Sequence, residues 1–440
     1  RASLYTGRYM AGHGVTENST APGNPELDPA IPTLGHRLRQ QGYRTAYKGK
    51  WHLQVSAHPD MAAYGYGDWT GNDMSFWGLQ GSGVEYDEPI ARDAAQWLRT
   101  EAPADQPWFL TVGLVNPHDI MWFPADQQWF PDHDPRTRER MVEFWAKADW
   151  GRADNCPLFT AEVPERFTTL PENFADDLTT KPEVHRRWMT EMERQQGAGV
   201  MPVEETWMWR RQLDYYAVLH ELSDISLGHI LGALDDTDAW RNTIVVFTSD
   251  HGDQCGSHQL RSKGPWNYEE TMRIPLYVVG PGVPAGVSCH SLTSHVDVAA
   301  TIAASADVDV DAQPDLAGSS LAPLLADPAG SVRDHVLFAQ DWPWYAGVEQ
   351  TRYASTGMFD GRFKYCRYYG IGGGHSVAGV ELPGPKRFGP DAAFEDHEHE
   401  LYDLVDDPHE MVNLAADQGR RTDVRDRFAT LLELERVAGA

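Results

Sequence analysis

Short apolar runs, separated by turn residues and amphipathic stretches, predict strands that alternate with helices along most of the chain. The runs "WFLTVGLV" and "TIVVFTS" are continuous and apolar, as strands buried on both faces of a parallel sheet are. Two shorter runs are also predicted strands: "IPLYVVG", and "YRTAY", which follows a helix-like stretch that stops at Gly42. The four predicted strands are 43–47, 108–115, 243–249 and 274–280.

One long helix is predicted between the second and third strands. Tyr215, Val218, Leu222 and Ile225 recur at spacings of three and four, so they form one apolar stripe. Strands that alternate with helices form a parallel sheet covered on both faces. The sequence therefore predicts an α/β fold in which helices sandwich a mostly parallel sheet.

Two segments depart from this alternation. Residues 121–203 are rich in Trp, Pro and charged residues, and they predict a long insertion beside the sheet. After residue 331 the pattern changes to antiparallel strands with tight turns such as Asp360-Gly361, and a charged amphipathic helix follows. We therefore expect an α/β domain over residues 1–331 and a smaller α+β domain with an antiparallel sheet over residues 332–440.

The composition is that of a globular protein with a strongly acidic balance. The 440 residues include 65 acidic and 37 basic side chains, a net charge of −28. This charge disfavours nucleic acid and anionic membranes as partners, and no apolar run approaches the roughly 18 residues of a transmembrane helix.

The four cysteines show no CxxC spacing. Scattered thiols favour the cytoplasm; a secreted or periplasmic location is the alternative, because a leader would precede Arg1. Oligomeric state is left open.

Polar motifs directly follow the predicted strands. "KGKWH" follows the first, "NPHD" the second and "DHGD" the third, and the polar loop "SHQLRSKGPWNYEE" leads into the fourth. Ligands of open parallel sheets bind outside the carboxyl ends of the strands, so these motifs are expected at one edge of the sheet. The candidate residues are Lys50, His52, His118, Asp250, His251 and Lys263.

The residue types at this edge suit an anion and a metal ion. Asp250 and His251 offer an oxygen and a nitrogen ligand, the two lysines suit a tetrahedral oxyanion, and the other two histidines can transfer protons near neutral pH. Each also has a structural alternative: Asp250 could cap the next helix, and Lys263 could be a solvated surface residue. A structural explanation would have to account for all four motifs together, which favours the functional one.

The motifs and their flanks also show a family resemblance. In chain order they are "RASLYTGRY", "IPTLGHRLRQQGYRTAYKGKWHL", "LVNPHD", "VVFTSDHGDQCGSH", "KGPWNYEETMRIPLYVVGPG", "SHVDVAATI" and "ELYDLVDDPHEMVNLA". Their order and spacing, from residue 1 to at least Leu414, resemble those of the formylglycine-dependent sulfatases of the alkaline phosphatase superfamily. The resemblance implies an alkaline phosphatase-like fold and hydrolysis of a sulfate ester to an alcohol and inorganic sulfate.

The resemblance also implies roles for individual residues. Lys50 and Lys263 are similar to the two sulfate-binding lysines, and Arg1 to the arginine that stabilises the nucleophile. His118 is similar to the general acid that protonates the leaving oxygen, and His52 to the histidine that takes a proton from the covalent intermediate. The family's nucleophile, a formylglycine made from Cys or Ser, is expected four positions before Arg1, with a first strand and two metal-binding aspartates further upstream.

Asp250 and His251 are similar to two of the family's metal ligands. Many relatives have Asn at the second position, so His251 is a departure from the family pattern. Calcium is the usual metal, and the nitrogen ligand leaves manganese or magnesium as alternatives. The implied reaction passes through a covalent sulfo-formylglycine, and a formylglycine-generating enzyme is the implied partner.

Two other functions stay open at this point. A phosphonate monoester or phosphodiester hydrolase of the same superfamily shares the nucleophile, but such relatives tend to lack the Lys-x-His pair formed here by Lys50 and His52. A non-catalytic binding scaffold would lack Cys or Ser at the nucleophile position.

The alcohol half of the substrate is expected to be a small molecule or a carbohydrate. Trp122, Trp342 and Trp344 are candidate aromatic walls of its pocket, and His258 lies in a loop of the family pattern and is a candidate substrate-binding residue. Packing within the core is the alternative for each of the four.

Overall fold

The computed structural model describes residues 1–16, 18–19, 25–130, 139, 163–191, 198–341, 352–370, 376–377, 380–381 and 389–439. The predicted strands form two pairs. β1 (Arg44–Gly49) and β2 (Trp108–Gly113) run parallel, with Ala46 opposite Leu110. β3 (Val245–Thr248) and β4 (Leu276–Val279) run antiparallel. Both pairs border one cavity, because side chains of β2 and of β3 line it.

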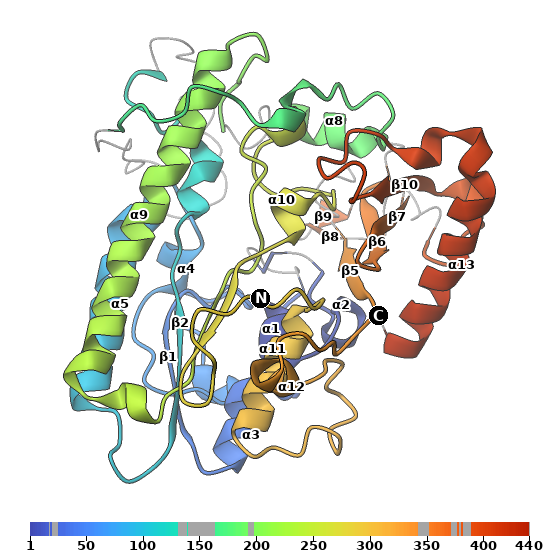
Figure 1. The fold of residues 1–440 in the computed structure, drawn as a ribbon. Helices are drawn as coiled ribbons and strands as arrows, with labels where there is room; N and C mark the ends of the chain where they lie inside the picture. The colour runs from blue at the N-terminus through green and yellow to red at the C-terminus, as the bar shows by residue number, and fades with distance from the viewer. Residues whose placement is uncertain are drawn as a thin grey trace.

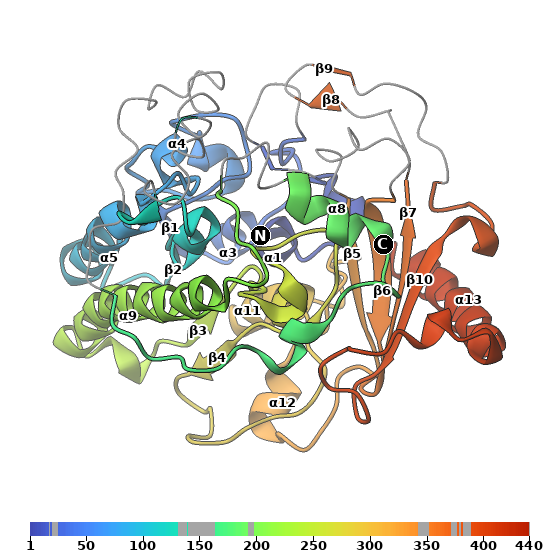
Figure 2. The same cartoon turned by 90° about the horizontal axis from the view of Figure 1, so that it is seen from above.

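Helices cover both faces of the β1–β2 pair. α5 (Ser82–Thr100) and α9 (Thr206–Asp236) run side by side along one face (Figures 1 and 2), where Trp97 and Leu234 pack on Ala46 and Leu110. On the other face, α3 (Leu34–Gln40) and α11 (His295–Ser305) bury leucines and alanines against Phe109. Phe109 and Leu110 point to opposite faces, as neighbours in a strand do. The α/β sandwich is therefore as predicted.

A four-stranded antiparallel sheet forms the C-terminal part, in the order β10-β7-β6-β5. The strands are β5 (Val336–Gln340), β6 (Ala354–Phe359), β7 (Phe363–Tyr369) and β10 (Glu398–Asp403). β6 and β7 meet at the predicted Asp360-Gly361 turn, where the φ of 94° at Gly361 favours glycine. α13 (Arg421–Ala438) covers one face of this sheet (Figure 2), with Val424 and Leu431 in its core.

The other described elements are short. The helices are α1 (Ala2–Thr6), α2 (Met10–His13), η1 (Met61–Tyr64), α4 (Asp73–Phe76), η2 (His118–Trp122), η3 (Glu172–Ala175), α8 (Glu183–Glu191), η5 (Ala239–Arg241), η6 (Ser257–Gln259), α10 (Glu269–Met272), α12 (Ala322–Ala326), η8 (Phe394–Asp396), η9 (Leu414–Ala416) and η10 (Gln418–Arg420), and the strands are β8 (Ser376–Val377) and β9 (Val380–Glu381). Within the described ranges, no helix combines the length and apolar character needed to cross a membrane.

Two details differ from the sequence prediction. β4 runs antiparallel to β3, because the residues between them form the polar loop of the site and the four-residue α10 instead of a helix that crosses the sheet. Ile225 is 57% exposed although Tyr215 and Val218 are buried. Three helical turns of about 3.6 residues each, counted from Tyr215, end near residue 226. Ser226 is therefore the buried residue at that point of the helix, and Ile225 lies beside the buried stripe.

The division into domains at residues 331 and 332 stays a prediction. So does the insertion at 121–203, of which residues 131–138, 140–162 and 192–197 lie outside the described residues.

Candidate functional site

The structure brings Arg1, Lys50, His52, His118, Asp250, His251 and Lys263 together around the cavity, which has a volume of about 1760 Å³. They come from the start of α1, the end of β1, the turn after β2, the end of β3 and the loop before α10. These segments lie far apart in the sequence. Convergence at the strand ends places three cations beside one carboxylate and three imidazoles.

Arg1 is held by two of the other site segments. Its guanidinium donates from Nη1 to the Lys50 carbonyl at 3.0 Å and from Nη2 to Asp250 Oδ2 at 3.2 Å. α1 is itself packed against β1, because the Tyr5 and Tyr47 hydroxyls are hydrogen-bonded at 2.8 Å and Tyr47 donates to the same Lys50 carbonyl at 2.6 Å. The arginine is therefore fixed between the β1 end and the β3 end.

Lys50 and His52 lie in the turn that leaves β1. The Lys50 ammonium is buried and donates to the Trp77 carbonyl at 2.8 Å. Burial, and then the charge of Arg1, lower the pKa of Lys50 to about 7. The His52 ring stacks on Trp77, with 5.5 Å between centroids, and burial followed by the Lys50 charge holds the pKa of His52 well below its usual range.

His118 and Lys263 meet across the cavity. His118 Nε2 lies 3.4 Å from Lys263 Nζ. Burial lowers the pKa of both side chains, and for His118 the charge of Lys263 lowers it further. The ring of His118 also packs against Gly78, where a Cβ would lie 2.2 Å from the imidazole. The neutral His118 ring therefore accepts from the Lys263 ammonium through Nε2.

Asp250 and His251 fit part of a metal site. Burial would raise the pKa of Asp250, but His251 and Arg1 outweigh it and hold the pKa well below its usual range. Burial lowers the pKa of His251 to about 4, so its ring is neutral at pH 7. His251 Nδ1 donates to the Gly252 carbonyl at 2.8 Å, which leaves the lone pair on Nε2, 3.8 Å from Asp250 Oδ1. A carbonyl partner on the second ring nitrogen is typical of metal-binding histidines.

These two side chains supply only part of a ligand set. Hard divalent cations take about six to eight oxygen ligands. Among the described ranges, no group of three or more His, Cys, Asp and Glu side chains is arranged to hold a metal ion.

His258 does not line the cavity. Its ring is fully buried, with Nδ1 2.7 Å from Asp176 Oδ2 and Nε2 3.0 Å from Asn173 Nδ2. The ring stacks on Tyr268, with centroids 3.9 Å apart. Both nitrogens are occupied by protein partners, so the geometry places His258 in packing between segments and not against a ligand.

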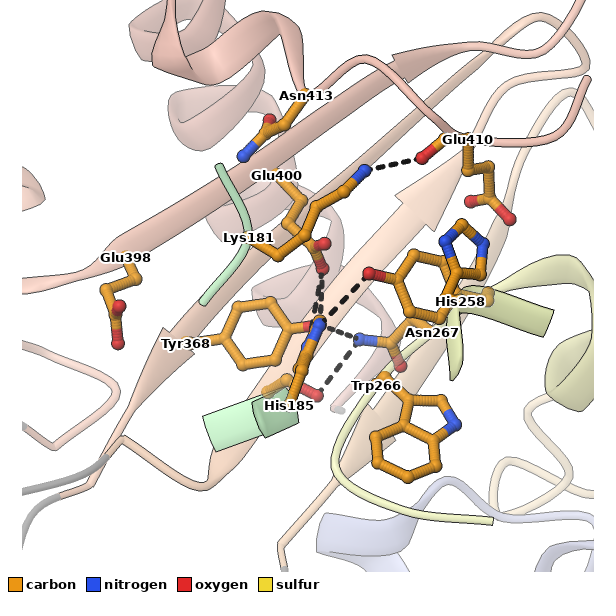
Figure 3. Close-up of polar contacts among 12 residues, drawn as sticks. Lys181, His185, His258, Trp266, Asn267, Tyr368, Glu398, Glu400, Glu410 and Asn413 are labelled. Carbon is orange, nitrogen blue, oxygen red and sulfur yellow. Dashed lines mark hydrogen bonds and ion pairs between the residues drawn. The ribbon is translucent and has the colours of Figure 1, made fainter. Parts of the chain in front are cut away.

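Around His258 a buried polar network joins the site loop to the C-terminal sheet (Figure 3). Tyr368 on β7 is its centre: the hydroxyl donates to Glu400 Oε2 at 2.5 Å and lies 3.2 Å from His185 Nε2. Asn267, at the end of the loop that carries Lys263, donates to the same hydroxyl at 3.3 Å. The loop before α10 is therefore anchored in the C-terminal part of the chain.

Replacing Tyr368 with Phe is expected to lower the free energy of unfolding by about 1–3 kcal/mol. The loss of the hydroxyl leaves Glu400, His185 and Asn267 without a shared partner in a buried place. Urea unfolding of the variant measures the change. Tyr277, which is 63% exposed, is the matched control, and Tyr277→Phe is expected to change stability by less than about 0.5 kcal/mol. Equal changes in the two variants would contradict the prediction.

Of the three tryptophans predicted to form walls of the substrate pocket, the structure describes Trp122. Trp122 lines the cavity, but its ring is 3% exposed within a core cluster and its Nε1 donates to the Gly78 carbonyl at 2.9 Å. Packing therefore accounts for most of its surface. Trp342 and Trp344 lie outside the described residues.

The structure places the segment 73–78 directly against the site, although no sequence motif indicated it. Asp73 accepts hydrogen bonds from the backbone amides of Trp51 and His52. The Trp77 carbonyl accepts from Lys50, and the Trp77 ring stacks on His52. Gly78 packs against the ring of His118. The turn residues in "GNDM" are the only local signal there, and they indicate a loop without indicating its neighbours.

Comparison with known proteins identifies the family of the chain. Residues 1–308 match the Sulfatase family model, and the chain belongs to the sulfatase family. It is 28% identical to the uncharacterized sulfatase YidJ of Escherichia coli K12, over 70% of this chain and 58% of that protein. It is 25% identical to the delta 4,5-hexuronate-2-O-sulfatase of Bacteroides thetaiotaomicron, over 95% of this chain and 74% of that protein. The chain thus spans little more than half the length of the first relative.

Solved structures share the fold. A putative sulfatase from Bacteroides thetaiotaomicron superposes with a TM-score of 0.68 at 23% identity, covering 100% of this chain and 82% of that one. The phosphonate monoester hydrolase of Agrobacterium radiobacter gives 0.63 at 20% identity, covering 99% and 85%. At these identities the likeness shows the fold alone, which both kinds of hydrolase share.

Proposed function

We propose that this protein hydrolyses a sulfate ester to an alcohol and inorganic sulfate. The observation that carries the proposal is the convergence of Arg1, Lys50 and Lys263 with His118 and His52 on one cavity. In a chain with a net charge of −28, three cations at one point are a specific arrangement for a small anion.

The cations bind and orient the sulfate group. Lys50, Lys263 and Arg1 all line the cavity, and Arg1 also donates to Asp250. Donors fixed in advance stabilise charge that develops on the equatorial oxygens, and each is worth about 2.7–4 kcal/mol in a transition state. The hydrogen bonds to the Lys50 and Trp77 carbonyls hold Arg1 and Lys50 in place before substrate arrives.

His118 supplies the proton for the leaving oxygen from Nε2. In the free protein, burial and the charge of Lys263 keep its pKa low. A bound sulfate ester carries a negative charge that offsets the lysines, so binding raises the pKa of His118 and charges the ring where the proton is needed. His52 also lines the cavity, and its neutral ring can accept a proton during product release.

Asp250 and His251 are the residues of this chain that would hold a divalent metal, for which calcium is the first candidate and manganese or magnesium are alternatives. Such an ion, together with a formylglycine made by a formylglycine-generating enzyme, would supply electrophilic activation and the nucleophile. The ionised carboxylate and the free Nε2 lone pair support this assignment.

Comparing an aryl sulfate with an aryl phosphonate monoester as substrates of the intact enzyme tests the function. We expect a higher kcat/KM for the sulfate. Faster phosphonate turnover would favour the phosphonate hydrolase, whose fold is shared. Turnover of neither, with tight binding of sulfate esters, would indicate a binding scaffold.

The alcohol half is proposed to be a carbohydrate or another small molecule. The Bacteroides relative that matches 95% of this chain is named for a hexuronate 2-O-sulfate, which makes sulfated sugars the first class to test.

The pH dependence of kcat/KM is expected to report Lys50. Its pKa is lowered to about 7, so the ammonium is charged below that pH and loses its proton as the pH rises. Sulfate binding should therefore weaken above about pH 7. Lys50→Arg keeps the charge throughout, and its profile is expected to be flatter on the alkaline side. An identical alkaline fall in both enzymes would assign the titration to another group.

A further inference from the structure

The turn after β1 presents Lys50 and His52 in a backbone conformation that needs external support. Gly49 has a φ of 83° and His52 a φ of 55°. The second value is in the left-handed region, which a histidine rarely adopts unless its surroundings hold it there. The carbonyl of Lys50 is bound by Arg1 and Tyr47, but these contacts do not reach the amides of the next two residues.

The carboxylate of Asp73 holds those two amides. Its Oδ1 accepts from the Trp51 amide and its Oδ2 from the His52 amide, both at 2.8 Å. The side chain is fully buried. Its own amide donates to the Ala57 carbonyl at 2.8 Å, so the carboxylate is fixed from behind. Two oxygens bonded to two consecutive amides leave the turn little freedom to rotate.

The residues after Asp73 reach the same side chains from the other side. The Trp77 ring stacks on the His52 imidazole at an interplanar angle of 22°, and the Trp77 carbonyl accepts from Lys50 Nζ. His52 Nε2 is buried and has no hydrogen-bond partner among the described residues. The ring is thus oriented by its backbone and by stacking, with one nitrogen left available.

We propose that Asp73 is a positioning residue for His52: its carboxylate fixes the strained turn that aims the imidazole into the site. The inference rests on the proposed function for its kinetic consequence only, because the geometry can be tested without turnover.

The test is Asp73→Asn in the intact enzyme. The amide group of Asn can accept through only one atom, so one of the two backbone amides loses its acceptor. We expect carbethoxylation of His52 by diethyl pyrocarbonate, followed by peptide mass spectrometry, to become about tenfold faster as the ring is released. We expect kcat for an aryl sulfate to fall about 10–100-fold, because a displacement near 1 Å costs that much, with little change in KM.

Asp87→Asn is the matched control. Asp87 is also buried and accepts from two consecutive amides, those of Val115 and Asn116, at 2.6 and 2.9 Å. It supports the neighbouring loop, so this variant should leave the carbethoxylation rate of His52 unchanged. A second control repeats Asp73→Asn in the His52→Ala variant, where there is no imidazole left to position. In that variant, Asp73→Asn should lower kcat by less than about twofold.

The outcomes are distinct. Unchanged carbethoxylation of His52 in folded Asp73→Asn, or an undiminished loss of kcat in the His52→Ala background, would overturn the positioning role. Faster carbethoxylation in an enzyme whose wild type hydrolyses neither aryl sulfates nor sulfated sugars would support the positioning role and reject the proposed function. If thermal melting shows that Asp73→Asn does not fold, Asp73→Glu, which retains both acceptors one methylene further out, is judged by the same two measurements.

Discussion

Replacing Asp250 with alanine is expected to abolish binding of the proposed divalent metal and to lower kcat/KM by about three orders of magnitude, because a metal contributes several kcal/mol to stabilising charge in such reactions. Asp250 is the carboxylate at the end of β3, its pKa is well below the usual range, and it also holds Arg1 at 3.2 Å. The loss of this carboxylate therefore removes a proposed metal ligand and the acceptor that holds the Arg1 guanidinium.

Metal content and activity are to be measured on the same sample. Elemental analysis of the purified enzyme after dialysis gives the metal-to-protein ratio, and the ratio should fall with activity. Asp311→Ala, at an exposed position, is the control and should keep both. Full metal content in the Asp250→Ala variant would contradict the assigned ligand, whatever its activity.

Replacing His118 with glutamine is expected to lower kcat/KM for a poor leaving group by about 10²–10⁴-fold, the usual contribution of a positioned general acid. Glutamine fills similar space beside Gly78 and can still meet Lys263, but it carries no transferable proton. The loss should shrink as the leaving group becomes more acidic, because an acidic phenol departs without protonation.

A series of aryl sulfates with phenols of increasing pKa measures this dependence. The logarithm of kcat/KM against leaving-group pKa should be steeper for His118→Gln than for the wild type. His290→Gln, in an exposed loop, should follow the wild-type line. Parallel lines for His118→Gln and wild type would assign His118 to binding instead of proton transfer.

Much of the fold could be predicted from the sequence, since it depends on local pattern. Continuous apolar runs marked β2, β3 and β4, the helix-like stretch that stops at Gly42 marked β1, and the spacing from Tyr215 marked α9. The direction of β4 could not be predicted in this way, because an apolar run has the same pattern in a parallel and an antiparallel pair. The exposure of Ile225 followed from a small drift between a three-and-four spacing and the true helical period.

The sequence by itself determined which chemical groups stand at the strand ends, because each motif is joined covalently to its strand. Its order of motifs also determined the sulfatase family. Only the tertiary structure decided what supports those groups. Asp73 reaches the amide of His52 across 21 residues, Asn267 reaches Tyr368 across 101, and His258 turns away from the cavity toward Asp176. Periodicity records which side of an element is buried, whereas the pairing of one buried carboxylate with particular amides depends on how distant segments pack.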